Sequence, residues 1–292
     1  FCDDPIHECK KYVWWQVADY LSITDSNLIH HLESNDDLAL SLKSILENQP
    51  SSADLNFAKI ALIEHYNGSE INFKDKIING LTGKEAMIYD QVLASREDFI
   101  QSIISEFEGD KSRFNFQIIS STSMSSNTLG RITVDNANSL LILHVNKNIT
   151  SNSPVLLIAR TIIHTFIHAD LHRKIYIDKN SPENEEFNTT FNKYNNDIFS
   201  ITSQQSSLTN LYIGVVAEAI KDFHKNRYPV EFDQIQSVDN SPYDPIELYQ
   251  AIAWEELENN NMLVWNNLSE TEKKKWKGLQ NYFYPMLTLE TN

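Results

Sequence analysis

The stretch Ile162-Ile163-His164-Thr165-Phe166-Ile167-His168-Ala169 decides how this chain folds. It belongs to an apolar segment that predicts one helix, which opens at Ser153-Pro154 and runs to about Ile177. Residues four apart in a helix lie on the same face, about one turn from each other. The spacing therefore predicts that His164 and His168 present two imidazoles able to hold one metal ion.

This spacing matches the H-E-x-x-H motif of zinc peptidases except at the second position. The glutamate that the motif has there takes a proton from the metal-bound water. The present chain has Thr165, and a threonine hydroxyl is not a general base near neutral pH. The pattern thus predicts the scaffold of a hydrolase together with loss of the hydrolysis.

The composition favours a folded, acidic protein. The 292 residues, of which 41% are hydrophobic, suffice for one large domain or two ordinary ones. The formal net charge of −16 repels phosphate backbones and anionic lipid, so we expect neither nucleic acid nor an anionic membrane as a partner. Glycine is scarce, and we find neither a phosphate-binding glycine motif nor an apolar run that would span a membrane.

Both cysteines, Cys2 and Cys9, lie close to the N-terminus. Two residues cannot make a cysteine-rich zinc site, so two interpretations stay open. One is a small disulfide loop between them. The other is a lipid anchor at Cys2 of an exported bacterial lipoprotein, against which the bulky Phe1 argues, because lipoprotein processing prefers a small residue there.

The order of periodic segments predicts an α+β fold, with helices, then strands, then helices again. Thr82 with Glu85, and Ser269 with Glu272, predict two capping boxes at helix starts. The predicted helices span residues 13–21, 37–46, 53–66, 82–107, 153–177, 208–223, 244–257 and 269–284, and the predicted strands 114–119, 131–134 and 140–145.

From about residue 81 onward the chain resembles the SprT-like, zincin-type metallopeptidases of Bacteroidetes bacteria. The helix with the two histidines is the most specific part of this resemblance. It implies a zincin-like domain over residues 81–292, with a small, mostly antiparallel sheet and helices that include the metal-type helix. Residues 1–80 form an N-terminal helical region that resembles no family we can name. The segments that carry the resemblance are Leu81–Glu85, Ile88–Asp90, Ile158–Leu171, Leu208–Tyr212, Tyr249–Leu257 and Trp265–Leu268.

The resemblance also implies which parts of the site have degenerated. Thr165 occupies the position of the general base, and Gln205 occupies that of the third metal ligand. Glutamine is a poor zinc ligand, and a catalytic zinc takes three protein ligands and a water. His164 and His168 are therefore interpreted as vestigial ligands, and we expect no cofactor, with zinc as the alternative.

Several other residues bear on the site. His172 follows His168 by one turn but lies about 80° round the helix from His164. His144, on the strand before the helix, is a candidate for the border of the cleft. We expect His65 to be partly exposed and His224 to be exposed. Carboxylates that could complete a rearranged site are Glu183, Glu185, Glu186 and Glu218.

We therefore expect a catalytically inactive relative of zinc metallopeptidases that acts as a binding or accessory subunit of a protein complex. The expected location is the bacterial cell envelope, or outside the cell, and the expected partner is a protein. One alternative is an active zinc metallopeptidase whose rearranged site takes a carboxylate from elsewhere in the chain. Another is a metal that the histidine pair holds for structure alone.

Overall fold

The structure is a computed structural model of the chain, and it divides into two compact units. The first consists of Phe1–Gly80, Phe107–Ile118 and Val134–Ile142, and the second of Leu81–Glu106, Ile119–Thr133 and Leu143–Asn292. The residues that the structure describes are 12–47, 50, 52–73, 77–95, 102–103, 105, 107, 115–124, 130–135, 140–176, 202–237, 244–259 and 262–287.

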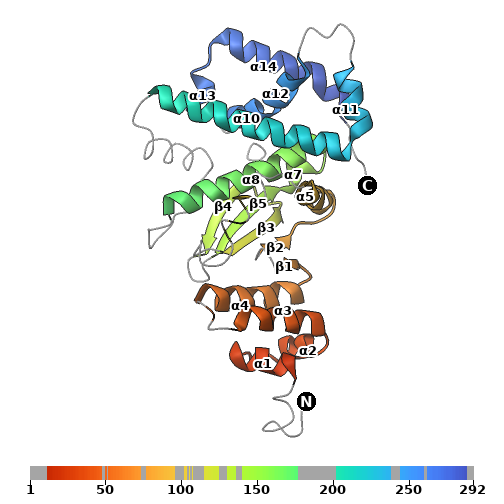
Figure 1. The fold of residues 1–292 in the computed structure, drawn as a ribbon, viewed down its shortest axis with the longest axis vertical. Helices are drawn as coiled ribbons and strands as arrows, with labels where there is room; N and C mark the ends of the chain where they lie inside the picture. Colours follow the sequence, from red (N-terminus) through yellow and green to blue (C-terminus); the bar gives the residue numbers. More distant parts are fainter. Residues whose placement is uncertain are drawn as a thin grey trace. The chain divides into compact units, whose positions relative to one another are not determined.

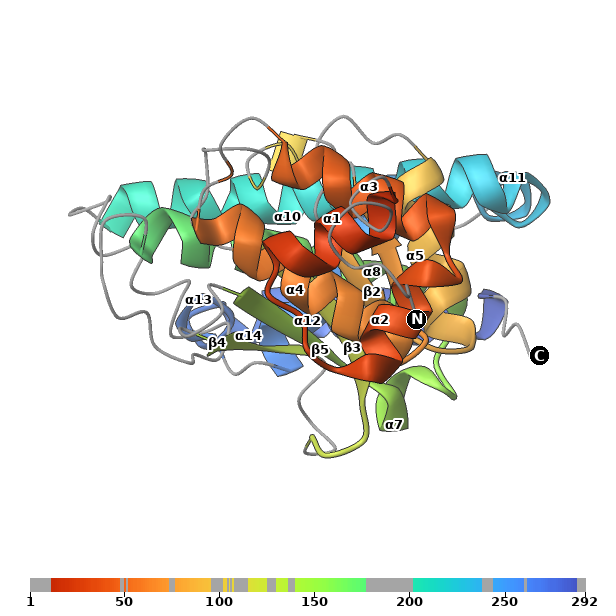
Figure 2. The same ribbon diagram turned by 90° about the horizontal axis from the view of Figure 1, so that it is seen from below.

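The N-terminal helices of the first unit pack against one another around an apolar core (Figure 1, Figure 2). They are α1 (Val13–Tyr20), α2 (Ser26–Glu33), α3 (Asp36–Leu46) and α4 (Ser52–Tyr66). Three of them confirm predicted helices, but α2 was not predicted. Its start is fixed by Asp25, whose carboxylate accepts hydrogen bonds from the backbone N–H groups of Asn27 and Leu28. Members of the core include Val17, Leu21, Leu32, Leu42, Phe57, Leu62, Ile78 and Leu140.

A glycine ends α4 and turns the chain into a pair of strands. Gly68 has a φ of 93°, and the N–H of Ser69 donates to the carbonyl of Glu64 at 2.9 Å, as in a Schellman motif. Strand β1 (Glu70–Asn72) then pairs antiparallel with β2 (Ile77–Gly80). The end of the N-terminal region that was predicted to be helical therefore contains two short strands.

The strands form one five-stranded mixed sheet in the order β1-β2-β3-β5-β4. Strands β3 (Asn115–Ser121), β4 (Gly130–Asp135) and β5 (Leu140–Asn146) confirm the three predicted strands. The α+β fold class is also confirmed. Because β4 is the last strand in this order, it forms one edge of the sheet.

Helix α8 (Val155–Tyr176) lies at the centre of the second unit (Figure 1). Every residue from Ile158 to Arg173 is buried, so this helix is covered all round. It contacts α5, α10 and α12. None of the helices in the described ranges is long and apolar enough to cross a membrane. The other helices of this unit are α5 (Lys84–Ala94), α7 (Lys147–Thr150), α10 (Thr202–Arg227), α11 (Pro229–Gln236), α12 (Pro245–Asn259), α13 (Leu263–Asn266), α14 (Glu270–Phe283) and the short η3 (Tyr284–Met286).

One of the two predicted capping boxes is present. Ser269 and Glu272 cap α14 reciprocally, as predicted. The box expected from Thr82 and Glu85 was wrong, because Gly83, with a φ of 61°, is the N-cap of α5 and no side chain caps it. The Glu85 carboxylate is buried and accepts hydrogen bonds from hydroxyls of β3 and α7 instead. Helix α5 also ends at Ala94, well before the predicted end near residue 107.

Two leucines of α3 allow a matched test of the core of the first unit. Leu42 is 0% exposed and Leu40, two residues away, is 53% exposed. We expect Leu42→Ala to lower the free energy of unfolding by about 2–5 kcal/mol, because it leaves a cavity. Leu40→Ala should change it by less than about 0.5 kcal/mol. Urea unfolding followed by far-UV circular dichroism measures both, and equal losses would contradict this packing.

Candidate functional site

Helix α8 carries four basic or imidazole side chains at intervals of four residues: Arg160, His164, His168 and His172. None of the four is more than 2% exposed. Buried charges and imidazoles are expensive to desolvate, so their surroundings must compensate them. The helices α10 and α12, which pack against α8, supply the compensating groups.

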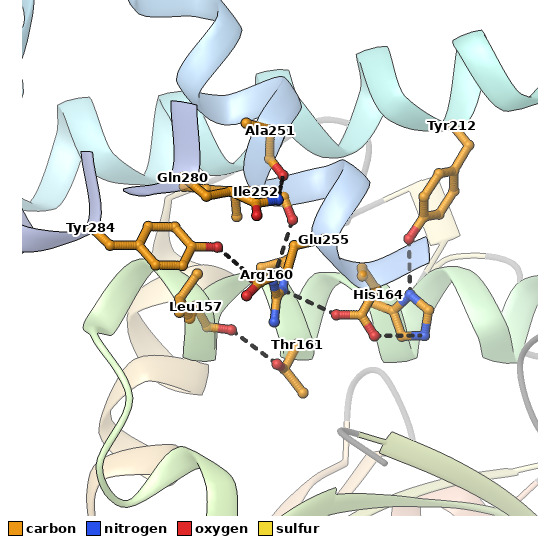
Figure 3. A network of polar contacts seen from close by, with 11 residues as sticks. Leu157, Arg160, Thr161, His164, Tyr212, Ala251, Ile252, Glu255, Gln280 and Tyr284 are labelled. Atoms are coloured by element: carbon orange, nitrogen blue, oxygen red, sulfur yellow. Dashed lines mark hydrogen bonds and ion pairs between the residues drawn. The ribbon is translucent and has the colours of Figure 1, made fainter. Parts of the chain in front are cut away.

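The guanidinium of Arg160 is held by two neighbouring carboxylates of α12 (Figure 3). Its Nη1 pairs with Glu255 and also donates to the carbonyl of Ile252 at 3.2 Å. Its Nε lies 3.0 Å from Oε2 of Glu256, which is 0% exposed. Burial alone would lower the pKa of Arg160, but the two carboxylates raise it above its usual value, so the side chain stays charged.

His164 lies between a tyrosine and the same carboxylate. Its Nδ1 is 2.9 Å from the hydroxyl of Tyr212 on α10, and its Nε2 is 3.6 Å from Oε1 of Glu256 (Figure 3). Burial lowers the pKa of His164, and Arg160 lowers it further, although Glu256 acts in the opposite direction. Burial and the Glu256 carboxylate raise the pKa of Tyr212 well above its usual value. A neutral imidazole and a neutral phenol thus face each other in this part of the site.

Further polar contacts tie the C-terminal helices to the same cluster (Figure 3). The hydroxyl of Tyr284 in η3 donates to Glu255, and the side-chain amide of Gln280 in α14 donates to the carbonyl of Ala251 at 2.9 Å. The carboxylates of α12 therefore link α8 to η3, and α14 contacts the backbone of α12. This is the arrangement of a structural ion-pair network, in which each charged group has a fixed partner.

Thr165 is packed where the sequence motif would have its base. It is 1% exposed, and its Oγ1 donates to the carbonyl of Ile162 at 2.7 Å. Its Cγ2 faces the backbone of Gly130 on β4, and a Cβ added at Gly130 would lie only 2.8 Å from it. The edge strand and α8 therefore touch at this point, and the space beside residue 165 is filled.

His168 and His172 are both 0% exposed. The rings of His164 and His168 have their centroids 6.2 Å apart. Burial, followed by the neighbouring His164 and His172, lowers the pKa of His168 well below its usual value, so this side chain is neutral at pH 7. Of the four side chains in this row on α8, Arg160 is charged, and the surroundings of His164 and His168 favour the neutral form.

These residues, as they are arranged, do not fit a zinc ion. Nδ1 of His164 contacts Tyr212, and its Nε2 faces a carboxylate that already pairs with Arg160. A fixed guanidinium beside the imidazole opposes the binding of a second cation. Across the described ranges, no group of three or more His, Cys, Asp or Glu side chains is placed to hold a metal.

The other predicted site residues do not gather here. His144 on β5 is half-buried and contacts Oγ1 of Thr133 on β4 at 2.8 Å. Glu218 forms an ion pair with Lys221 on the surface of α10, so it does not reach the site. Gln205 lies in α10, but its side chain is outside the part of the chain that the structure describes. The remaining candidates outside the described residues are Cys2, Cys9, Glu183, Glu185 and Glu186.

His224 was predicted to be exposed, and that prediction was wrong. It is 0% exposed, its Nδ1 lies 2.9 Å from the hydroxyl of Tyr249, and its Nε2 lies 3.2 Å from Oε1 of Glu231. His224 therefore has the same kinds of partner as His164: a tyrosine hydroxyl at Nδ1 and a glutamate carboxylate at Nε2. His224 follows the buried Ile220 by one helical turn, and this spacing could have revealed its burial.

Three residues of this site were not predicted from the sequence. Arg160, Tyr212 and Glu256 complete the surroundings of His164, but they come from three helices far apart in the chain. Two signals were available. Arg160 stands four residues before His164 in an apolar run, and Glu256 stands four residues after Ile252 in another. A charge on the apolar face of a helix calls for a buried partner.

Comparison of the chain with models of known protein families, with curated proteins and with solved structures gives no match. The resemblance to SprT-like proteins therefore rests on the sequence segments quoted above.

The contact between Gly130 and Thr165 can be tested by a double-mutant cycle. We expect Gly130→Ala to lower the free energy of unfolding by about 1–3 kcal/mol, because its methyl group collides with Cγ2 of Thr165. Thr165→Ser removes Cγ2 and should recover part of this loss in the double variant. Gly214→Ala, where the added Cβ meets nothing within 4 Å, is the control and should stabilise α10. Additive effects at positions 130 and 165 would contradict the contact.

Because His164 and His168 are buried, we expect the free energy of unfolding to fall in mild acid. The pKa values of His164 and His168 are lowered in the folded state, so below about pH 6.5 the unfolded chain binds more protons than the folded one. Their contribution is complete above pH 6.5 and is lost as the pH falls, by at most about 1.4 kcal/mol per pH unit for each histidine. Urea midpoints between pH 7.5 and 5.5 should show this slope, and His168→Gln should reduce it. An unchanged slope in that variant would exclude His168 as its source.

Proposed function

We propose that this chain is a catalytically inactive relative of zinc metallopeptidases that acts as a binding or accessory subunit of a protein complex. In this proposal residues 81–292 form a zincin-like, SprT-like domain and residues 1–80 an accessory region. The ordered sequence segments that resemble the family support it. So do the α+β fold and the single buried helix that carries both His164 and His168.

The packing of Thr165 is the observation that carries this proposal. A metallopeptidase needs a carboxylate at this position to take a proton from water. Here the hydroxyl of Thr165 is bonded to its own helix, and the methyl group rests on the backbone of Gly130. The position therefore holds neither a base nor the room in which a longer acidic side chain could reach a substrate.

The charges around His164 also favour a structural role. Glu256 forms an ion pair with Arg160 and faces His164 with its other oxygen. A carboxylate held in this way is compensated, and removing one partner of such a buried pair is strongly destabilising. The side chains of His164 and Glu256, which could have bound a metal, thus hold α12 against α8.

The rearranged metallopeptidase remains the second candidate, and one observation favours it. Glu256 is a carboxylate from elsewhere in the chain, with an oxygen 3.6 Å from Nε2 of His164. To act as a ligand or base it would have to leave Arg160, which is itself buried. This requirement makes the candidate weaker than the inactive scaffold.

The proposed partner is a protein with a basic contact surface. The chain has a formal net charge of −16, which speeds association with basic surfaces and opposes binding to acidic ones. A location in the bacterial cell envelope, with or without a lipid at Cys2, is part of the proposal. Mass spectrometry of the native N-terminus decides between a lipid, a disulfide with Cys9 and neither.

Metal content and peptidase activity together test the proposal. We expect purified protein to contain no zinc that depends on His164, because the residues around it are already paired. We also expect no chelator-sensitive cleavage of an unfolded protein such as casein. Elemental analysis of wild type and His164→Ala measures the first, and a fluorescent casein assay the second. Circular dichroism confirms that the variant is folded.

Other outcomes point to other functions. About one zinc per chain that is lost in His164→Ala, with activity that Glu256→Gln abolishes, would establish the rearranged peptidase. Zinc without activity, together with a melting temperature that chelator lowers, would indicate a structural metal. Zinc that persists in His164→Ala is bound elsewhere in the chain.

A further inference from the structure

Two histidines of the first unit meet across neighbouring helices. His31 lies on α2 and His65 near the end of α4, and Nε2 of His31 is 2.9 Å from Nδ1 of His65. Both side chains are half-buried. A hydrogen bond between two imidazoles requires one ring nitrogen to donate and the other to accept. One hydrogen therefore lies between the two ring nitrogens.

The surroundings hold these rings in place. The side-chain amide nitrogen of Asn35 donates to the carbonyl of His31 at 2.6 Å and lies 3.5 Å from Nδ1 of the same residue. The ring of Tyr66 meets the ring of His31 edge-on, with centroids 5.4 Å apart. Because Nδ1 of His31 faces an amide donor, its Nε2 carries the hydrogen that is shared with His65. Burial and then His65 lower the pKa of His31, which favours the neutral form of that ring.

The distance between the two nitrogens suits one metal ion. With metal–nitrogen bonds of about 2.0 Å, a separation of 2.9 Å subtends about 90° at the metal. That is the angle between neighbouring ligands in square-planar and octahedral sites, which copper(II) and nickel(II) favour. A tetrahedral zinc ion would need the nitrogens about 3.3 Å apart.

We propose that His31 and His65 form a binding site for a divalent transition metal of the copper or nickel type, which joins α2 to α4. The metal takes the place of the shared hydrogen. Because the two nitrogens point at each other, each ring turns by roughly 40° to direct its lone pair to the ion. His31 loses the hydrogen on Nε2 to water and takes one up from water at Nδ1, so the 3.5 Å contact of that nitrogen with the Asn35 amide is given up. Both imidazoles stay neutral, as metal ligands must be.

Water completes the coordination in this proposal. Within the ranges that the structure describes, no third His, Cys, Asp or Glu joins the pair. A site with two protein ligands leaves several positions of the metal open, so the ion exchanges readily and can accept a further ligand. The acidic charge of the chain, −16 overall, favours the approach of cations.

Neighbouring histidines provide a matched control. His30 precedes His31, but it lies on the exposed side of α2, where its Nδ1 is 3.4 Å from Glu33. His164 belongs to the second unit and has its own partners. A metal bound by any exposed histidine would be weakened by His30→Ala, whereas the proposed site would not.

The test is a titration of the full-length chain with nickel(II), which does not oxidise cysteine. Isothermal titration calorimetry should give one site per chain in wild type, in His30→Ala and in His164→Ala. His31→Ala and His65→Ala should each weaken this site at least tenfold, because one ligand cannot chelate. The melting temperature of wild type should rise with nickel concentration, and that of the two variants should not. Equal weakening by His30→Ala, or wild-type affinity in His31→Ala and His65→Ala, would overturn the proposal.

A second measurement needs no substitution. The electron paramagnetic resonance spectrum of wild type with one equivalent of copper(II) should show two equatorial imidazole nitrogens, whereas a spectrum with a single nitrogen ligand would contradict the paired site. Circular dichroism and the metal-free melting temperature show whether each variant is folded.

Discussion

The second unit depends on one buried positive charge. Arg160 stands in the middle of a helix that is covered on all sides, and a guanidinium cannot lose its proton there. Two adjacent carboxylates of α12 must therefore face α8, which fixes how these two helices pack. His164, Tyr212 and Tyr284 then take their positions from those carboxylates and from α8.

This dependence explains why a pair of histidines at metal-binding spacing can have another role. His164 lies one helical turn from Arg160 and has its partners in the same ion-pair network. The spacing of four residues between two histidines therefore does not define a metal site by itself. The repetition of the tyrosine–histidine–glutamate arrangement around His224 supports this view. There a buried imidazole has the same two kinds of partner, although no metal-binding motif surrounds it.

The sequence predicts those parts of the structure whose cause is local. The proline at position 154 and the apolar run after it were sufficient to predict α8, and Ser269 with Glu272 were sufficient for the start of α14. The strands β1 and β2 are only three and four residues long and are stabilised by pairing. Segments this short show no alternation of apolar and polar residues from which they could have been predicted. Glu256 was missed because its partners lie almost a hundred residues earlier. The contact of His65 with His31 was missed because it joins two helices.

The glycine on the edge strand limits which side chains position 165 accepts. With Gly130 in contact with the methyl group of Thr165, this position is shaped for a short branched side chain. A longer acidic side chain there would need the strand further from the helix. Residues 130 and 165 are therefore coupled, and a substitution at one of them has to be matched by a change at the other.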